Sequence, residues 1–286
     1  MAADLEMINV CVLNVGHMRT SRRFGGAEVS SPFARLYYLT KGSVTIHLPN
    51  QDVEAHPGFM YLIPSFMPHS YTCENECEFY YLFVYERYGK QSDIFDIYNF
   101  PYKVEANHAI DLLFQNYCNF YPELNFPYQT EEDFYTHSSY FDYVERYSQM
   151  DKATKMQLLG FVWIVASFFM KRSNSKLDSM DERVTKVMTF VKTHVNLPLS
   201  LEDMAQEINV TKSHLGRIFR ESLGISPLQY VTRTKVQCAQ RLLMTTTHSI
   251  RYIASEVGFQ DVSYFIRVFK RSIGLTPQEY REKLKY

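Results

Sequence analysis

Two segments in the last third of the chain carry basic side chains of the kind that bind nucleic acid. A guanidinium group can donate two hydrogen bonds to a guanine edge or hold a phosphate, and an apolar side chain can contact a thymine methyl group. Single arginines also occur on any solvated helix, so the argument for binding depends on their setting. The candidate DNA-contact residues are Lys212, Ser213, Gly216, Arg217 and Arg220 in the first segment, and Val262, Ser263, Ile266, Arg267, Lys270 and Arg271 in the second.

Both segments belong to an internal repeat. SLEDMAQEINV, from Ser200, matches SIRYIASEVGF, from Ser249, at an offset of 49 residues. TKSHLGRIFRESLGISPLQY then matches QDVSYFIRVFKRSIGLTPQEY at an offset of 50, so the second copy has one extra residue in its turn. Because apolar and turn residues recur at matched places, a merely solvated surface is a poor explanation of the basic segments.

Each copy predicts two helices joined by a tight turn. Ser200 and Ser249 are the expected N-caps, and apolar residues follow at helical spacing. Asn209 and Gly258 tolerate the left-handed backbone that such a turn requires. A glycine and then a proline end each second helix.

The stretch GFQDVSYFIRVFKRSIGLTPQEYR, Gly258 to Arg281, resembles the signature of the AraC/XylS family of bacterial transcription regulators. The resemblance implies an all-α DNA-binding domain with helix-turn-helix units at about 200–224 and 249–274, joined by a long helix at about 228–245. It also implies that both recognition helices enter adjacent major grooves, roughly 34 Å apart, and that RNA polymerase is a partner. Ile266 stands where the family often has a polar residue, so base preference there is not transferable.

Chain length and charge indicate two domains. The net charge of −1 conceals an asymmetry: residues 180–286 hold 16 basic and 10 acidic residues, and the rest hold 14 and 21. A basic half fits a DNA-binding domain. We predict a domain over 1–172, a linker over 173–180 and the DNA-binding domain over 181–286, whose first helix follows a capping-box pattern from Ser179 to Glu182.

The region before the helices predicts strands. ARLYYLT, SVTIHLP, FMYLIP and EFYYLFVY are rich in strand-forming residues, with turn signals at Lys41-Gly42 and Pro57-Gly58. HPGFMYLIPSFMPHSY resembles the second half of a cupin barrel. The expected fold class is therefore α+β with two domains: an N-terminal cupin-like β-barrel followed by helices, and a C-terminal all-α domain.

Three helical stretches are expected after the barrel, at His108–Phe120, Phe134–Tyr147 and Asp151–Arg172. The family resemblance implies that such helices form a homodimer interface, and burial against the chain's own barrel is the alternative. The apolar run from Met156 to Met170 is 15 residues long, which is short for a membrane span, so no membrane partner is expected.

Tyrosines line the expected barrel, and a tyrosine offers an apolar ring with a polar tip. Such a wall suits a small polar effector such as a sugar. The alternative is that each is an ordinary core or dimer residue. The effector-binding candidates are Tyr38, His47, Tyr61, His69 and Tyr81.

An enzyme is not expected. A cupin-type metal site needs paired histidines on one strand, and none appears, so we predict no metal and no cofactor. A DNA-repair protein with this domain would carry a reactive cysteine motif, which is also lacking. The five scattered cysteines, and an N-terminus without a signal-peptide pattern, favour the reducing cytoplasm.

These observations predict a cytoplasmic, sequence-specific transcription regulator, expected to be an activator, that binds double-stranded promoter DNA. Its barrel is expected to respond to a small-molecule effector. The alternative is a constitutive DNA-binding regulator whose barrel only dimerises.

Overall fold

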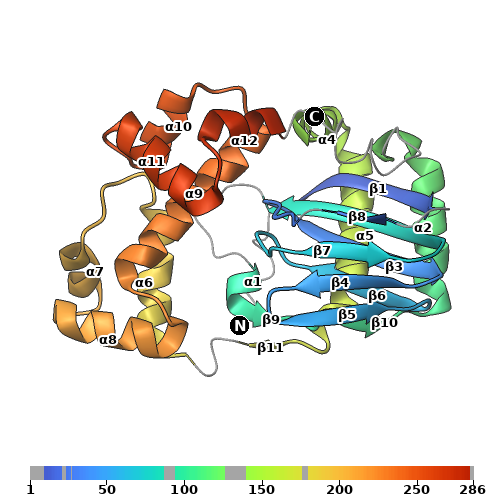
Figure 1. Cartoon of the computed structure of the whole chain (residues 1–286), viewed down its shortest axis with the longest axis horizontal. Helices are drawn as coiled ribbons and strands as arrows, with labels where there is room; N and C mark the ends of the chain where they lie inside the picture. The colour runs from blue at the N-terminus through green and yellow to red at the C-terminus, as the bar shows by residue number, and fades with distance from the viewer. Residues whose placement is uncertain are drawn as a thin grey trace. The chain divides into compact units, whose positions relative to one another are not determined.

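The strands and helices fall into two units. The computed structural model describes residues 10–20, 24–26, 28–86, 94–125, 140–175 and 180–283. The described residues before Arg87, together with 100–125 and 140–173, form a β-sheet unit, and 180–283, with 94–99 and 174–175, form a helical unit. Figure 1 shows the arrows of the first and the helices of the second.

The described strands of the β-sheet unit pair, all antiparallel, into two sheets. The strand order is β1-β8-β3-β6-β10 in one sheet and β2-β7-β4-β5 in the other. No pairing within the described residues joins the two sheets, so the predicted β domain is present without observed closure into a barrel. The strands are β1 (Val10–Thr20), β2 (Phe24–Gly25), β3 (Ala34–Lys41), β4 (Val44–Leu48), β5 (Gln51–Ala55), β6 (Phe59–Ile63), β7 (Ser70–Cys73), β8 (Cys77–Glu86) and β10 (Lys103–Glu105).

Strand alternation separates the tyrosines onto two faces. Successive side chains of a strand point to opposite sides. Tyr37 of β3 packs with a core cluster that includes Tyr61 and Tyr71, and its hydroxyl lies 2.9 Å from that of Tyr71. Tyr38, the next residue, instead stacks on Phe114 of a covering helix. The turns predicted at Lys41-Gly42 and Pro57-Gly58 lie between β3 and β4 and between β5 and β6.

The covering helices of this unit are α2 (His108–Phe120), the 3-10 turn η1 (Pro122–Leu124), α4 (Tyr140–Gln149) and α5 (Lys152–Met170). The sequence predicted α2 and α5 closely. The prediction for 134–147 is met in part by α4, because residues 134–139 lie outside the described residues. Helix α5 passes behind the strands and across their direction (Figure 1), and Phe114 of α2 meets Phe161 of α5 edge-on at 5.0 Å.

Helix α5 is strongly apolar. Its 19 residues are long and apolar enough to cross a membrane by length and composition, which the 15-residue run in the sequence did not predict. A core helix of a soluble protein passes the same test. Trp163, the single tryptophan of the chain, lies on α5 and is half-buried. The fully buried side chains of α5 are Leu158, Phe161, Val162, Val165 and Phe169.

The helical unit consists of seven helices within residues 180–283, with a small addition from earlier in the chain. Helix α1 (Ile94–Ile97) leads into β9 (Tyr98–Asn99), which pairs with β11 (Asn174–Ser175). The seven are α6 (Glu182–Thr193), α7 (Leu201–Glu207), α8 (Lys212–Leu223), α9 (Pro227–Thr245), α10 (Ile250–Glu256), α11 (Val262–Ile273) and α12 (Pro277–Lys283). Helix α6 begins one residue after its N-cap, Asp181, whose carboxylate accepts a hydrogen bond from the backbone N–H of Arg183.

Helix α9 is shared by two cores. Its first turns pack with α6, α7 and α8 through Tyr230 and Val231, and its later turns pack with α10, α11 and α12. Lys235 lies near the middle of α9 and is 5% exposed. Its Nζ donates hydrogen bonds to the backbone oxygens of Leu197 and Gly258, each at 2.8 Å. One buried ammonium therefore connects the loop before the first repeat to the turn of the second.

Candidate nucleic-acid interface

The first repeat forms a helix-turn-helix from α7 and α8. Met204 and Ala205 of α7 are buried in one cluster with Leu215 and Phe219 of α8. Asn209 occupies the turn with φ of +53°, the left-handed conformation that the sequence predicted for it. The next residue donates its N–H back to the oxygen of Ala205 at 3.0 Å, and this contact closes the turn.

The second repeat builds the same turn from α10 and α11. Gly258 has φ of +72°, and Phe259 donates its N–H to the oxygen of Ala254 at 2.9 Å. Two residues, Phe259 and Gln260, then precede the N-cap Asp261, where the first repeat has Val210 alone before Thr211. The extra turn residue predicted from the change of offset is therefore present.

Capping fixes both ends of the second helix in each repeat. The Thr211 side chain accepts from the N–H of His214 at 3.2 Å, and the Asp261 carboxylate accepts from the N–H of Tyr264. Gly224 and Gly274 end α8 and α11 in the left-handed conformation, as the sequence predicted. These ends hold the exposed surface of each helix in a defined orientation to its core.

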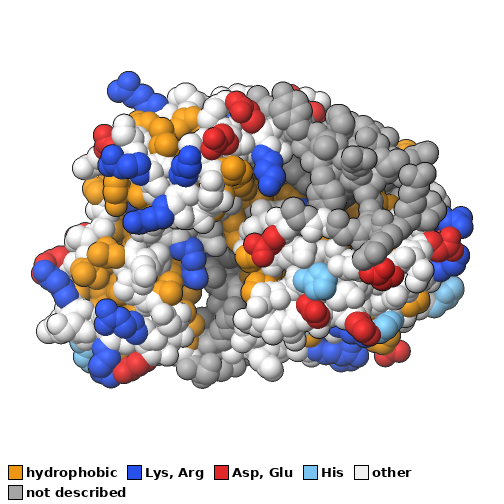
Figure 2. Space-filling view, in the orientation of Figure 1, with side chains coloured by type: hydrophobic (Ala, Val, Ile, Leu, Met, Phe, Trp, Pro, Cys, Tyr) orange, Lys and Arg blue, Asp and Glu red, His pale blue; other side chains and the backbone are white. Residues whose placement is uncertain are grey.

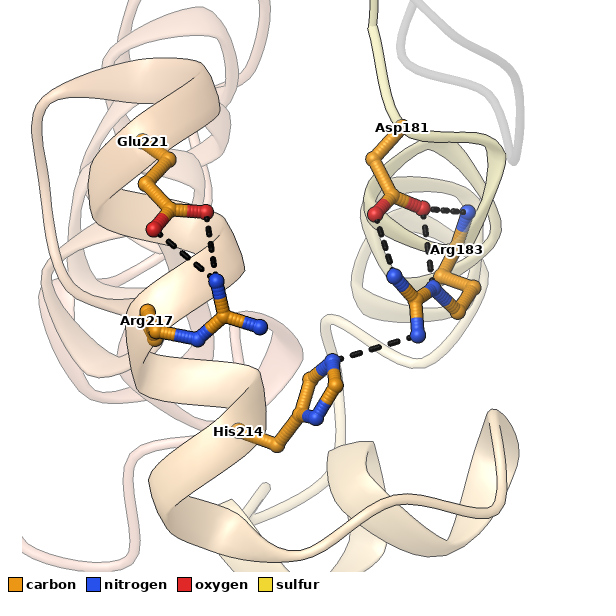
Figure 3. A network of polar contacts seen from close by, with 5 residues as sticks. All are labelled: Asp181, Arg183, His214, Arg217 and Glu221. Carbon is orange, nitrogen blue, oxygen red and sulfur yellow. Dashed lines mark hydrogen bonds and ion pairs between the residues drawn. The ribbon is translucent and has the colours of Figure 1, made fainter.

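The outer face of α8 carries most of the residues predicted for the first unit. Lys212, Ser213, Arg217 and Arg220 are exposed, and Gly216 is half-buried. Lys212 forms an ion pair with Glu202 of α7. Arg217 Nη1 lies 3.0 Å from Glu221 Oε1 one turn further along the helix (Figure 3).

The outer face of α11 is more strongly basic. Arg267, Lys270 and Arg271 are exposed, as is Ser263. Lys and Arg side chains outnumber Asp and Glu on the visible face of the helical unit (Figure 2). The sequence did not single out Tyr264, which is 52% exposed with the guanidinium of Arg267 5.9 Å from the centre of its ring.

Two residues of α11 that were predicted as DNA contacts also pack against the core. Val262 and Ile266 are half-buried and pack against the core cluster of the second repeat. Their exposed edges are available to a partner, while much of each side chain stabilises the fold. The apolar side chain of Ile266 therefore has a packing role in this chain.

A polar network connects the start of α6 to the start of α8. Asp181 accepts hydrogen bonds from Arg183 Nε at 3.0 Å and Nη2 at 2.6 Å, and Arg183 Nη1 lies 3.1 Å from His214 Nε2 (Figure 3). The Arg183 hydrogen bonds lower the pKa of Asp181 to about 2. Because Asp181 stays ionised at neutral pH, this network holds the first turn of α8 beside the residues that follow the predicted linker.

The predicted effector residues do not converge on one place. Tyr61 and His69 are buried, and both belong to the space between the two sheets, where His69 meets Tyr71 edge-on. Tyr81 is buried and hydrogen-bonds Asn125, while Tyr38 faces α2 instead. His47 lies on β4, bonded to Asp52 and Thr72 at 2.8 Å each, with 38% of its side chain exposed.

His69 is neutral in this setting. Burial, and to a smaller extent the nearby Arg35 guanidinium, lower the pKa of His69 to about 4. Its Nδ1 lies 2.7 Å from the backbone oxygen of Met67, so that nitrogen carries the proton. Arg35, which the sequence did not single out, is 3% exposed, and its guanidinium lies over the rings of Phe33 and Phe83.

The described ranges contain side chains that could serve as metal ligands or reactive thiols. No group of three or more His, Cys, Asp or Glu side chains there is arranged to hold a metal ion. The cysteines form no disulfides, and burial raises the pKa of Cys118 to about 12 and that of Cys238 to about 11. Thiols with such pKa values are poor nucleophiles at neutral pH.

Comparisons with known proteins match this part of the chain. Residues 204–283 match the family model described as a helix-turn-helix domain. The chain is 27% identical to a transcriptional regulator with an AraC-type DNA-binding domain from Chromobacterium violaceum, over 36% of this chain and 92% of that chain (TM-score 0.35). The chain therefore holds a helix-turn-helix domain over residues 204–283, similar to the DNA-binding domain of AraC-type regulators. Its helical unit is accordingly a DNA-binding domain, and the AraC family is one of regulators rather than enzymes.

Two further proteins that are similar to this chain differ in how much of it they cover. The lactose operon transcription activator of Staphylococcus xylosus is 28% identical over 138 residues, which is 48% of this chain and 50% of that protein. The chain thus spans half the length of this relative. ToxT of Vibrio cholerae O395 shares the fold over 96% of this chain and 98% of its own, with 17% identity and a TM-score of 0.51.

Proposed function

We propose that the chain is a sequence-specific transcription regulator that reads promoter DNA with α8 and α11 in adjacent major grooves. The observation that carries the proposal is the pair of helix-turn-helix units, each with a buried inner face and a basic outer face. Arg217 and Arg267 hold equivalent exposed positions, which suits guanidinium groups that read guanine edges. The other predicted contact residues flank them and can hold phosphates.

Activation is the outcome we propose for bound promoters, with RNA polymerase as the partner. The similar lactose operon protein of Staphylococcus xylosus is a transcription activator. We place the working protein in the cytoplasm, as a homodimer through the helices of its β-sheet unit. We also propose that residues 1–172 form the sensing and dimerising domain and that residues 173–180 are the linker. Residues 181–286 form the DNA-binding domain in this proposal.

The β-sheet unit is proposed as the sensor. In this proposal its two sheets are the halves of a cupin-like barrel, and a small polar effector lies between them near Tyr61 and His69. Effector binding would change the DNA affinity of the helical unit, which is a coupling free energy between two sites. The alternative, a constitutive binder whose β-sheet unit only dimerises, has no such coupling.

In vitro selection of DNA by the full-length chain at fixed salt tests the DNA proposal. The expected result is a motif of two half-elements about one helical turn apart, since adjacent grooves on one face are separated by that distance. A matched selection with Arg217→Ala/Arg267→Ala should lose the motif. A wild-type pool without any enriched sequence, with and without a metabolite mixture, would contradict the proposal.

Thermal unfolding with a panel of sugars and other small metabolites tests the sensor. A ligand that binds only the folded state raises the unfolding temperature, and the rise grows with the logarithm of its free concentration above Kd. A ligand that does so and also shifts DNA affinity identifies the effector class. A panel without any stabilising compound favours the constitutive alternative.

A further inference from the structure

The two recognition helices differ in charge at one matched position. On the proposed function, α8 and α11 both face DNA, and each carries three basic residues. At the offset of 50 residues, Glu221 of α8 stands where α11 has Arg271. The first helix therefore presents a carboxylate at a place where the second presents a guanidinium.

Glu221 is placed to act on the residue predicted to read bases. Its Oε1 and Oε2 atoms lie 3.0 Å and 3.2 Å from Nη1 of Arg217, so one nitrogen is held by both oxygens (Figure 3). The pair is four residues apart on one helix face, and 58% of the Glu221 side chain is exposed. An exposed pair of this kind is weak, so it can open when a better acceptor is offered.

The second helix has no equivalent restraint. Within the described residues, no carboxylate lies within 4.0 Å of the basic groups of Arg267, Lys270 or Arg271. In the first repeat, by contrast, Lys212 and Arg217 each face a carboxylate of their own repeat. Cationic side chains without a carboxylate partner bind phosphates whatever the DNA sequence. Each phosphate that they neutralise releases counterions from the DNA.

The Glu221 carboxylate should also repel the phosphates of bound DNA directly. It lies in the later part of α8, whereas base contacts in helix-turn-helix proteins come mainly from the N-terminal part of the recognition helix. A carboxylate in that later part approaches the phosphate backbone, where like charges repel. Only a compensating contact, such as Arg217 bidentate to guanine, would offset the repulsion.

We propose that Glu221 is a specificity-determining residue that makes the first unit bind weakly to all DNA except its own site. The second unit supplies the phosphate binding that is independent of sequence. The Glu221 carboxylate orients Arg217 and removes the first unit's non-specific affinity. Sequence discrimination by the whole chain then comes mainly from α8.

The test exchanges the two matched residues. Glu221→Arg gives α8 the charge of α11, and Arg271→Glu makes the reverse change. For each full-length variant, affinity is measured for the selected motif and for unrelated duplex DNA over a range of salt. Glu221→Arg should raise affinity for unrelated DNA roughly 3- to 10-fold, steepen its salt dependence by about one unit of slope, and reduce the ratio of specific to non-specific affinity. Arg271→Glu should lower both affinities and leave that ratio close to the wild-type value.

Controls separate this role from a structural one. Glu221→Gln keeps the size of the side chain and should lower the specificity ratio in the same direction. Glu207→Gln, an exposed acid of α7 that the proposal does not use, should leave the ratio unchanged. If Glu221→Arg and Glu221→Gln both keep the wild-type ratio while the motif is still selected, the inference is wrong and the proposed function stands. A wild-type chain that selects no motif would overturn both.

Discussion

The two helix-turn-helix repeats have equivalent cores, but their turns have different surroundings. Asn209, in the turn of the first repeat, is exposed, whereas Gly258, in the matching turn of the second, lies against Lys235 and the loop before the first repeat. The first turn is thus at the surface, and the second is part of the joint between the repeats. One repeated motif therefore meets two different packing constraints, and sequence matching alone does not show which copy is the more constrained.

Replacement of the turn residues should give the largest difference in stability between the two repeats. A Cβ at Gly258 would lie 2.4 Å from Lys235 Nζ and 2.7 Å from both the Val195 oxygen and the Asn196 carbonyl carbon. Since the backbone atoms cannot yield and the positive φ adds strain, we expect Gly258→Ala to lower the free energy of unfolding of the helical unit by about 3–5 kcal/mol. Asn209→Ala should cost about 1 kcal/mol. Urea unfolding followed by far-UV circular dichroism measures both, and equal losses would show that the joint is not as crowded as described.

Lys235 should give the next largest effect and a distinctive pH dependence. Burial lowers the pKa of Lys235 to about 8, below its unfolded value, so the unfolded chain binds more protons between pH 8 and 10.5. The helical unit should therefore gain stability as the pH rises through this range, by up to about 3 kcal/mol. The neutral amine still has two N–H groups for the oxygens of Leu197 and Gly258.

Lys235→Met is the matched variant for that prediction. It should unfold about 2–3 kcal/mol more easily at pH 9.5, because two buried oxygens lose their donors. It should also lack the part of the pH dependence that the lysine supplies. Urea midpoints at pH 7.5, 8.5 and 9.5 provide the measurement, and parallel curves for the two proteins would show that Lys235 does not titrate as described.

Single arginine variants should compare the contributions of the two repeats to DNA affinity. Arg217→Ala and Arg267→Ala should each weaken binding to the selected motif by about 1–3 kcal/mol if the side chain reads a base. The loss at Arg217 should be the larger of the two, since the Glu221 carboxylate would then face the DNA without the base contact that offsets its repulsion. Arg220→Ala should instead weaken all sequences alike. Fluorescence anisotropy with motif and scrambled duplexes measures these effects, and retention of motif binding by both alanine variants would place the reading faces elsewhere.

The helical unit was largely predictable because its signals are local and occur twice. N-caps, turn residues and terminal glycines recur at a fixed offset, and each copy checks the other. Helix α12 is not predicted from the sequence, because Pro277 indicates the end of α11 and, equally, the first position of a new helix. The start of α6 is set by Asp181 rather than by Ser179, which lies outside the described residues.

The β-sheet unit was less predictable because its arrangement depends on distant pairing. β1 went unpredicted since Asn14 and Gly16 interrupt its apolar pattern. Gly16 stands opposite Tyr81 of β8, and a Cβ there would meet the Tyr81 ring, a constraint that no local pattern shows. The Asp181, Arg183 and His214 network likewise joins residues about thirty positions apart in the chain.

The position of Trp163 on α5 has an optical consequence. Light that excites tryptophan alone reports on the β-sheet unit, because the helical unit, like the rest of the chain, has no other indole. The outer faces of α8 and α11, where we propose that DNA binds, carry no tryptophan. A change in the colour or intensity of that emission when DNA is added would therefore be a signal carried from one unit to the other, visible without any attached dye.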